Sequence, residues 1–253
     1  MSRRKIAGMV IMGAMLVGAV VFLFSRMVLV PYEPMPLSVL ERMPAGEALV
    51  VPGLANVPTT GALQPRVLLI EFSDFQCPYC RVGSDNLAEV MGACGDAVRV
   101  WFVNTPLPFH NRARDAAAAA LAAHQQGRFF AYAERLFAGQ DALDDASLLR
   151  HARELGLDLD RFERDRAGDD VNRALARDDR IGRAARVSGT PSFSLNGRLI
   201  EGSKDPEVFL EVVAEEVSKV DAEMAAGLPL HEALRKVVTA NAGSNYVKNV
   251  LGW

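Results

Sequence analysis

The sequence predicts an α/β domain, because short apolar stretches typical of buried strands alternate with longer stretches of helical pattern. The first strand, 67–70, leads into a Cys-x-x-Cys motif, Cys77 to Cys80, and a helix follows the motif. A second strand covers 97–103, and a hairpin with an Asn-Gly turn covers 188–201. We expect the domain to be organised around the strand and the helix that carry the two cysteines.

The cysteine pair lies where this strand meets this helix. Pro78 suits the first position of a helix, where its missing N–H leaves no hydrogen bond unmade. Cys77 then occupies the helix N-terminus, where unpaired N–H groups and the helix dipole stabilise a thiolate. This arrangement is typical of a redox-active cysteine.

A Cys-x-x-Cys motif also has other uses. Zinc needs four ligands, commonly from a second cysteine pair or two histidines, and neither Cys94 nor any histidine stands at such a spacing. Attachment of a c-type haem needs a histidine directly after the second cysteine, where this chain has Arg81. A structural disulfide would close a very small loop and add little stability. The sequence favours dithiol–disulfide chemistry at Cys77 and Cys80 over these alternatives and predicts neither a cofactor nor a metal.

Composition narrows the class of protein further. A net charge of -3 over 253 residues gives no sign of the basic surface that nucleic-acid binding requires, so no nucleic-acid partner is expected. Three cysteines are too few for a fold held together by disulfides. We expect Cys94 to behave as a small buried hydrophobic residue, and Asp74 and His110 to be loop residues without a catalytic role.

The N-terminus has the pattern of a membrane anchor. Arg3, Arg4 and Lys5 precede an uncharged stretch, 6–24, which is long enough as a helix to cross the roughly 30 Å hydrocarbon core of a bilayer. A cleaved signal peptide has the same basic start, but this stretch is long for one and no small-x-small cleavage site follows it. We expect residues 1–26 to anchor the chain, with the basic residues in the cytoplasm and the rest outside, where disulfides form.

The remaining chain divides into three parts. Residues 27–65 are rich in proline and glycine and are predicted to be a linker or arm, with 49–51 the stretch best suited to a short edge strand. Residues 66–220 form the predicted domain, within which 112–186 contain almost only helical signals. Residues 221–253 are predicted to be a C-terminal extension with one short helix.

The motifs of the predicted domain occur in an order that resembles a known family. They are Phe72-Ser73-Asp74-Phe75-Gln76-Cys77-Pro78-Tyr79-Cys80, the helical stretch, and Gly189-Thr190-Pro191. Over residues 66–220 the chain resembles the DsbA-like thiol:disulfide oxidoreductases of the thioredoxin superfamily. The resemblance implies a thioredoxin-like fold, in which a central mixed sheet is flanked by helices and carries an inserted helical subdomain, here preceded by the expected transmembrane helix.

The resemblance also implies roles for five residues. Cys77 matches the exposed nucleophile and Cys80 the buried resolving cysteine. Pro191 matches the family's cis-proline beside the disulfide, with Thr190 before it; taken alone, Thr-Pro would instead suggest an ordinary turn. Glu71 stands six residues before Cys77, where the family carries a buried acid that exchanges protons with the resolving cysteine. The alternative for Glu71 is an exposed charge at a strand edge.

The expected function is exchange of disulfides with extracytoplasmic proteins, with the domain on the periplasmic side of the inner membrane. We expect the pair to act as a dithiol oxidase, with a reductase of the same fold as the alternative. The expected partners are substrate proteins with thiols or disulfides and a membrane redox partner that recycles the pair. An alternative of another class is a binding or scaffold protein whose Cys-x-x-Cys motif is idle or holds a metal.

Overall fold

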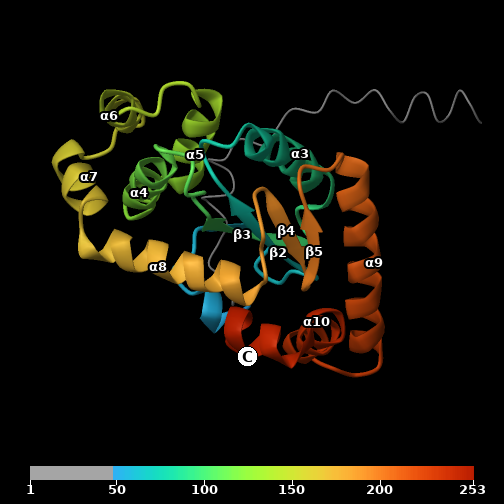
Figure 1. Cartoon of the computed structure of the whole chain (residues 1–253). Helices are drawn as coiled ribbons and strands as arrows, with labels where there is room; N and C mark the ends of the chain where they lie inside the picture. The colour runs from blue at the N-terminus through green and yellow to red at the C-terminus, as the bar shows by residue number, and fades with distance from the viewer. Residues whose placement is uncertain (1–47) are drawn as a thin grey trace, which may run out of the picture. The chain divides into compact units, whose positions relative to one another are not determined.

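The computed structural model describes residues 48–253, and the expected anchor, with its helix at 6–24, lies outside this range. The described residues contain a five-stranded mixed sheet with the strand order β1-β3-β2-β4-β5 (Figure 1). β2 and β3 are parallel, and the other neighbouring strands are antiparallel. The strands are β1 Thr59–Gly61, β2 Val67–Ser73, β3 Val98–Asn104, β4 Ser192–Leu195 and β5 Arg198–Glu201. Within residues 48–253, no helix is long and apolar enough to cross a membrane.

Helices cover both faces of the sheet, which is the α/β arrangement that the sequence predicts. The α-helices are α3 Pro78–Cys94, α4 Ala113–His124, α5 Phe129–Ala138, α6 Asp145–Glu154, α7 Leu159–Arg166, α8 Asp169–Ala184, α9 Pro206–Ala225 and α10 Leu230–Tyr246. A short 3-10 turn, Pro52–Leu54, and a π-helical turn, Val247–Leu251, precede and follow these elements.

The central strand β2 is buried along its whole length, as a strand covered on both faces must be. Its side chains alternate between two hydrophobic clusters. Leu68 and Ile70 pack in a cluster with residues of α8 and α10. Val67 and Leu69 pack in the other cluster, with residues of α3 and α9. The odd-numbered side chains of β2 therefore face the helix that carries the two cysteines.

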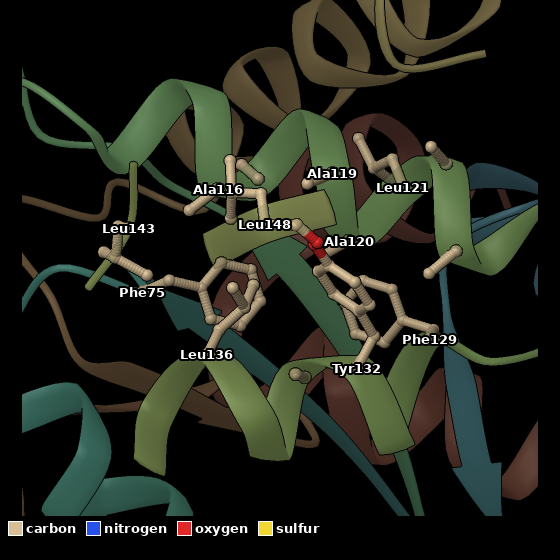
Figure 2. Packing of buried hydrophobic residues seen from close by; sticks show 14 of the residues in the cluster. Phe75, Ala116, Ala119, Ala120, Leu121, Phe129, Tyr132, Leu136, Leu143 and Leu148 are labelled. Atoms are coloured by element: carbon tan, nitrogen blue, oxygen red, sulfur yellow. The ribbon is translucent and has the colours of Figure 1, made fainter. Parts of the chain in front are cut away.

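Helices α4–α8 occupy the predicted helical stretch, and α4–α7 gather around a core of their own (Figure 1). Figure 2 shows Leu136 and Tyr132 of α5 and Phe75 of the cysteine loop directed towards the alanines of α4. Alanine, the best helix former, also lets the neighbouring helices approach closely. α8 joins this core to the sheet, because its first half packs among these helices and its last half packs against β2 and β3.

The edge strand lies at Thr59–Gly61 rather than at 49–51, where no strand forms. Its side chains help to fix it, since the Thr59 hydroxyl donates to the Val100 carbonyl at 2.7 Å. The end of the residues predicted as a linker, 27–65, therefore belongs to the sheet. The sequence prediction missed this strand because two β-branched threonines flanked by glycine and proline give little periodic signal.

The C-terminal residues also differ from the prediction. The helix expected to end near 219 continues as α9 to Ala225, and the short helix expected near 230–239 continues as α10 to Tyr246. Leu234 and Val238 of α10 are fully buried against the sheet. The Tyr246 and Ser194 hydroxyls form a buried hydrogen bond of 2.6 Å between α10 and β4. The stretch 221–253 is thus packed into the hydrophobic core of the domain.

The core of α4–α7 gives a testable prediction. Leu136 is fully buried in this core, so replacing it with alanine removes apolar contacts and leaves a cavity. We expect Leu136→Ala to lower the free energy of unfolding by about 2–5 kcal/mol, measured by urea denaturation. The control is Leu199→Ala on β5, where the side chain is 38% exposed and the expected change is within about 0.5 kcal/mol. Equal losses in the two variants would contradict the packing described.

Candidate active site

The two cysteines lie at the start of α3, where β2 delivers the chain. Cys77 is the N-cap residue and Pro78 the first helical residue, as the sequence predicts. Both thiols are free in this structure. Cys77, expected to be exposed, keeps only 4% of its surface accessible, and Cys80 keeps none. Cys77 is covered because its Sγ lies 3.6 Å from the carbonyl oxygen of Thr190.

Cys80 is buried at the end of β2. The backbone N–H of Asp74 donates to its Sγ at 3.3 Å. Burial raises the pKa of the Cys80 thiol to about 12, and this effect outweighs the polar contacts from Thr190, Asp74 and Ser73 that lower it. Cys80 is therefore held as a neutral thiol in the reduced protein.

The loop before β4 forms a second wall beside the cysteines. Its Thr190–Pro191 peptide bond is cis. Pro191 packs against Gly83 of α3, where an added Cβ would come within 3.2 Å of the proline ring and 3.0 Å of the Phe193 ring. Gly83 thus permits the close approach of α3 to this loop. Sequence patterns alone do not identify Gly83, because a single glycine within a helical pattern has no distinct meaning until the residues packed against it are known.

Asp74 fixes the loop between β2 and α3. Its carboxylate is fully buried and accepts hydrogen bonds at 2.8 Å from the backbone N–H groups of Gln76 and Leu107. The same carboxylate lies 2.8 Å from Nδ1 of His110. Asp74 and His110 are loop residues, as expected, but they are paired with each other. This pair ties the cysteine loop to the segment after β3.

Gln140, just after α5, fixes the same loop from another side. Its Nε2 donates to the carbonyl oxygens of Phe75 at 2.9 Å and of Cys77 at 2.8 Å. Gln76 makes two further bonds, accepting from the N–H of Arg112 at 2.7 Å and donating to Asn111 at 3.0 Å. Sequence reasoning missed Gln140, because it lies far along the chain from the Cys-x-x-Cys motif and belongs to no motif of its own.

Glu71 is buried in the interior of the sheet, with 3% of its surface accessible, and is not an exposed charge at a strand edge. It lies in register with Phe102 of β3 and Phe193 of β4. Burial among these neighbours raises the pKa of Glu71 to about 7, and a contact with the Ser73 hydroxyl opposes part of the rise. Glu71 faces α3, since it is an odd-numbered residue of β2.

The three other buried carboxyl groups of residues 48–253 all have charged or ionisable partners. Asp74 pairs with His110, Asp178 with Arg177, and Glu216 with Lys219 and Arg198. The Oε1 atom of Glu71 has no hydrogen-bond partner. Glu71 is thus the buried acid of residues 48–253 without a charged or ionisable side chain paired to it.

Cys94 lies at the far end of α3 from the pair. Its Sγ donates to the Val90 carbonyl at 3.0 Å, and it packs against the cluster between α3, α9 and the sheet. Burial raises the pKa of its thiol. Residues 48–253 contain no cluster of three or more His, Cys, Asp and Glu side chains able to hold a metal ion.

The buried Glu71 gives a prediction for the pH dependence of stability. In the unfolded chain the Glu71 carboxyl ionises near pH 4.5, whereas in the folded protein it keeps its proton until about pH 7. The stability that the protonated carboxyl contributes is therefore fully present below pH 4.5 and lost as the pH rises to about 7, a loss of about 3 kcal/mol. Glu71→Gln should remove this loss and be more stable than the unaltered reduced protein at pH 8.

Urea denaturation of the reduced proteins at pH 4.5 to 8 measures this difference. Glu89→Gln, at an exposed position on the same helix as the cysteines, is the control and should follow the unaltered protein at every pH. A Glu71→Gln protein with the unaltered pH profile would show that Glu71 does not carry a raised pKa.

Comparisons with known proteins agree with this geometry. Residues 68–214 match the family described as DSBA-like thioredoxin domain. A thioredoxin-like oxidoreductase from Silicibacter pomeroyi is 30% identical, with a TM-score of 0.59 over 63% of this chain and 91% of that one. The thiol-disulfide exchange protein alpha-DsbA2 from Wolbachia pipientis is 22% identical, with a TM-score of 0.58 over 63% and 86% of the two chains, and shows likeness of fold alone.

Curated relatives that match part of this chain are longer proteins. The Na(+)/H(+) antiporter NhaA 3 of Salinispora tropica is 36% identical over 153 residues, which are 60% of this chain and 24% of the antiporter. The Na(+)/H(+) antiporter NhaA of Herminiimonas arsenicoxydans is 33% identical over the same shares of the two chains. The chain thus spans about a quarter of the length of these relatives. The family match and the fold agree with the sequence prediction: the chain belongs to the DsbA-like thioredoxin domain family.

Proposed function

We propose that this protein is a dithiol oxidase that transfers a Cys77–Cys80 disulfide to thiols of extracytoplasmic proteins. The observation that carries the proposal is the asymmetry of the pair: Cys80 is fully buried, whereas Cys77 caps α3 and keeps some exposure. An incoming thiolate attacks the Cys77 sulfur, which belongs to the less buried cysteine of the two. Cys77 is the nucleophile and Cys80 the resolving cysteine, with Thr190, Pro191 and Glu71 around them.

The reaction proceeds by two thiol–disulfide exchanges. A substrate thiolate attacks the Cys77 sulfur, the Cys77–Cys80 bond breaks, and Cys80 takes its electron pair. A second substrate thiolate then attacks the substrate sulfur of the mixed disulfide, so that the substrate gains a disulfide and Cys77 leaves. The enzyme ends as a dithiol, and a membrane redox partner that accepts two electrons restores the disulfide.

The position of Cys77 as the N-cap of α3 supports the oxidising direction. A helix N-terminus is a favourable place for negative charge and so stabilises a reduced cysteine pair. A stabilised reduced form makes the disulfide a stronger oxidant. The outward location follows from the basic residues before the apolar stretch at 6–24, which we propose anchors the chain in the inner membrane with its domain on the periplasmic side.

The surface beside Cys77 suits polypeptide substrates. Tyr79 and Val82 on the first turns of α3 are 69% and 47% exposed, and Phe109 on the adjoining loop is 74% exposed. Large apolar side chains with this exposure mark a contact surface for a partner. A protein that still has free thiols and exposed apolar residues fits this surface.

The reduction potential of the pair tests the direction of transfer. The full-length protein is equilibrated with buffers of reduced and oxidised glutathione, and the fraction of the Cys77–Cys80 pair that is oxidised is measured. A value near -120 mV, roughly that of a strong oxidant, supports the oxidase, and a value near -270 mV, roughly that of thioredoxin, identifies a reductase. Thiol titration that finds no reversible disulfide would favour a binding or scaffold role instead.

A trapping experiment identifies the substrates. In Cys80→Ala the Cys77 thiolate still exchanges with a substrate disulfide to form a mixed disulfide, but the sulfur that would displace the substrate from Cys77 is gone, so substrate proteins should accumulate on Cys77. We expect bands of higher mass on non-reducing gels of cells that produce the variant, and reductant should abolish them. The control is the double variant Cys77→Ala/Cys80→Ala, which has no nucleophile and should give no such bands. Absence of adducts in the single variant would argue against protein substrates.

A further inference from the structure

The buried Cys80 needs a source and a sink for a proton. When a substrate attacks Cys77, Cys80 leaves with a negative charge in a site without water access, and its raised pKa makes the anion a poor leaving group. In the reverse step, Cys80 must lose its proton before it attacks the mixed disulfide. A group within the protein has to supply and remove this proton.

The strand β2 places a serine between the acid and this thiol. Glu71 and Ser73 are two residues apart on β2, so both side chains point to the face covered by α3. Cys80 belongs to the first turn of α3, and its bond to the Asp74 N–H sets its sulfur beside the residue that precedes Asp74. That residue is Ser73.

The Ser73 hydroxyl is free to serve both neighbours. It is buried and makes no hydrogen bond of ordinary geometry in the structure. Its place on β2, two residues after Glu71 and directly before Asp74, whose N–H binds the Cys80 sulfur, sets it beside both groups. In agreement with this position, the Ser73 side chain lowers the pKa of Glu71 and that of Cys80. A hydroxyl both donates and accepts, so a single rotation turns its hydrogen from one neighbour to the other.

We propose that the Ser73 hydroxyl is a proton relay between the Glu71 carboxyl and the Cys80 sulfur. The inference rests on thiol–disulfide exchange through Cys77 and Cys80, and it holds for either direction of transfer.

In the oxidising direction, the relay delivers a proton to Cys80 while the disulfide breaks. The substrate sulfur forms a bond to the Cys77 sulfur, the Cys77–Cys80 bond breaks, and its electron pair passes to Cys80. Ser73 gives its hydroxyl proton to Cys80 and takes the carboxyl proton of Glu71. Cys80 ends as a thiol, Ser73 is unchanged, and Glu71 ends as a carboxylate. In the reverse step the carboxylate takes the proton back through Ser73.

The other ionisable groups near this path are engaged elsewhere. Cys77 is the ionisable group that acts on Cys80 by its charge. Asp74, the next residue along the chain, has its carboxylate turned to His110 and Leu107. Asp178 of α8 is held by Arg177 and by the backbone and side chain of Asn104 on β3. β4 contributes Ser192 and Phe193 beside Glu71 and no ionisable side chain.

Rapid mixing of the reduced protein with excess oxidised glutathione separates the relevant steps. Attack of Cys77 on oxidised glutathione forms the mixed disulfide and expels one glutathione, at a rate that depends on the concentration of oxidised glutathione. Attack of Cys80 on the mixed disulfide then expels the second glutathione, at a rate that does not depend on this concentration. The release of the second glutathione is measured from pH 5 to 9, and we expect its rate to rise around pH 7, as Glu71 ionises.

Ser73→Ala should slow the second step by about tenfold or more at pH 8 and leave the first step unchanged. In this variant the rate of the second step should no longer rise near pH 7 and should instead keep increasing up to pH 9. Ser73→Thr keeps the hydroxyl and should restore the rise. The matched control is Ser194→Ala on the neighbouring strand β4, which loses a buried bond to Tyr246 but should keep both rates and the pH profile.

An unaltered second step in Ser73→Ala overturns the relay and leaves exchange by the cysteines intact. Equal slowing of both steps also overturns it, because a general distortion of the site would act on both. Failure of the unaltered protein to release the second glutathione from the mixed disulfide would refute exchange through Cys80, and the relay with it. Glu71→Gln should match Ser73→Ala, and the double variant should be no slower than either single one.

Discussion

The structure of the site depends on the burial of one sulfur atom where β2 ends and α3 begins. Cys80 has no accessible surface, and the Asp74 N–H holds it at the end of the strand. Cys77 keeps 4% of its surface accessible, so the two cysteines differ in burial, and the proposed exchange assigns substrate attack to Cys77. Burial also removes Cys80 from the protons of bulk water. Access, order of attack and the need for an internal proton carrier all follow from this one position.

The backbone around that position is held by side chains from distant parts of the chain. Asp74 joins it to the segment after β3, and Gln140 joins it to the helical stretch. Phe75 is inserted into the core of α4–α7. Its ring stacks on that of Phe102, with 5.2 Å between the ring centroids, and packs on that of Phe137, with 4.9 Å between the centroids. The helical stretch thus supports the cysteine loop, and its packing and the site are parts of one structure.

The sequence predicted the elements whose patterns are local. β2, α3 and the hairpin were recognisable from apolar runs, Pro78 and the Asn-Gly turn. It missed the edge strand β1 and the full extent of α10, because both owe their position to contacts with residues far along the chain. The same limit applies to the site. Cys77 and Cys80 carry a motif, whereas Gln140 acquires its place only when α5 folds onto the cysteine loop. The alternative of an exposed Glu71 stayed open because periodicity does not reveal which strands flank β2.

The loss of stability that the buried Glu71 causes when it ionises indicates a role beyond structure. A buried carboxyl without a neutralising cation destabilises the fold once it ionises, and a structural acid is normally paired, as Asp74, Asp178 and Glu216 are. Glu71 instead faces two phenylalanines and a single hydroxyl, and its pKa near 7 leaves both protonation states populated at neutral pH. A group that is equally ready to give and to take a proton suits a thiol that must do both in each catalytic cycle. In the proposed relay, the absence of a cation beside Glu71 leaves the carboxyl with a proton to give to Cys80, because a paired carboxylate would hold its charge.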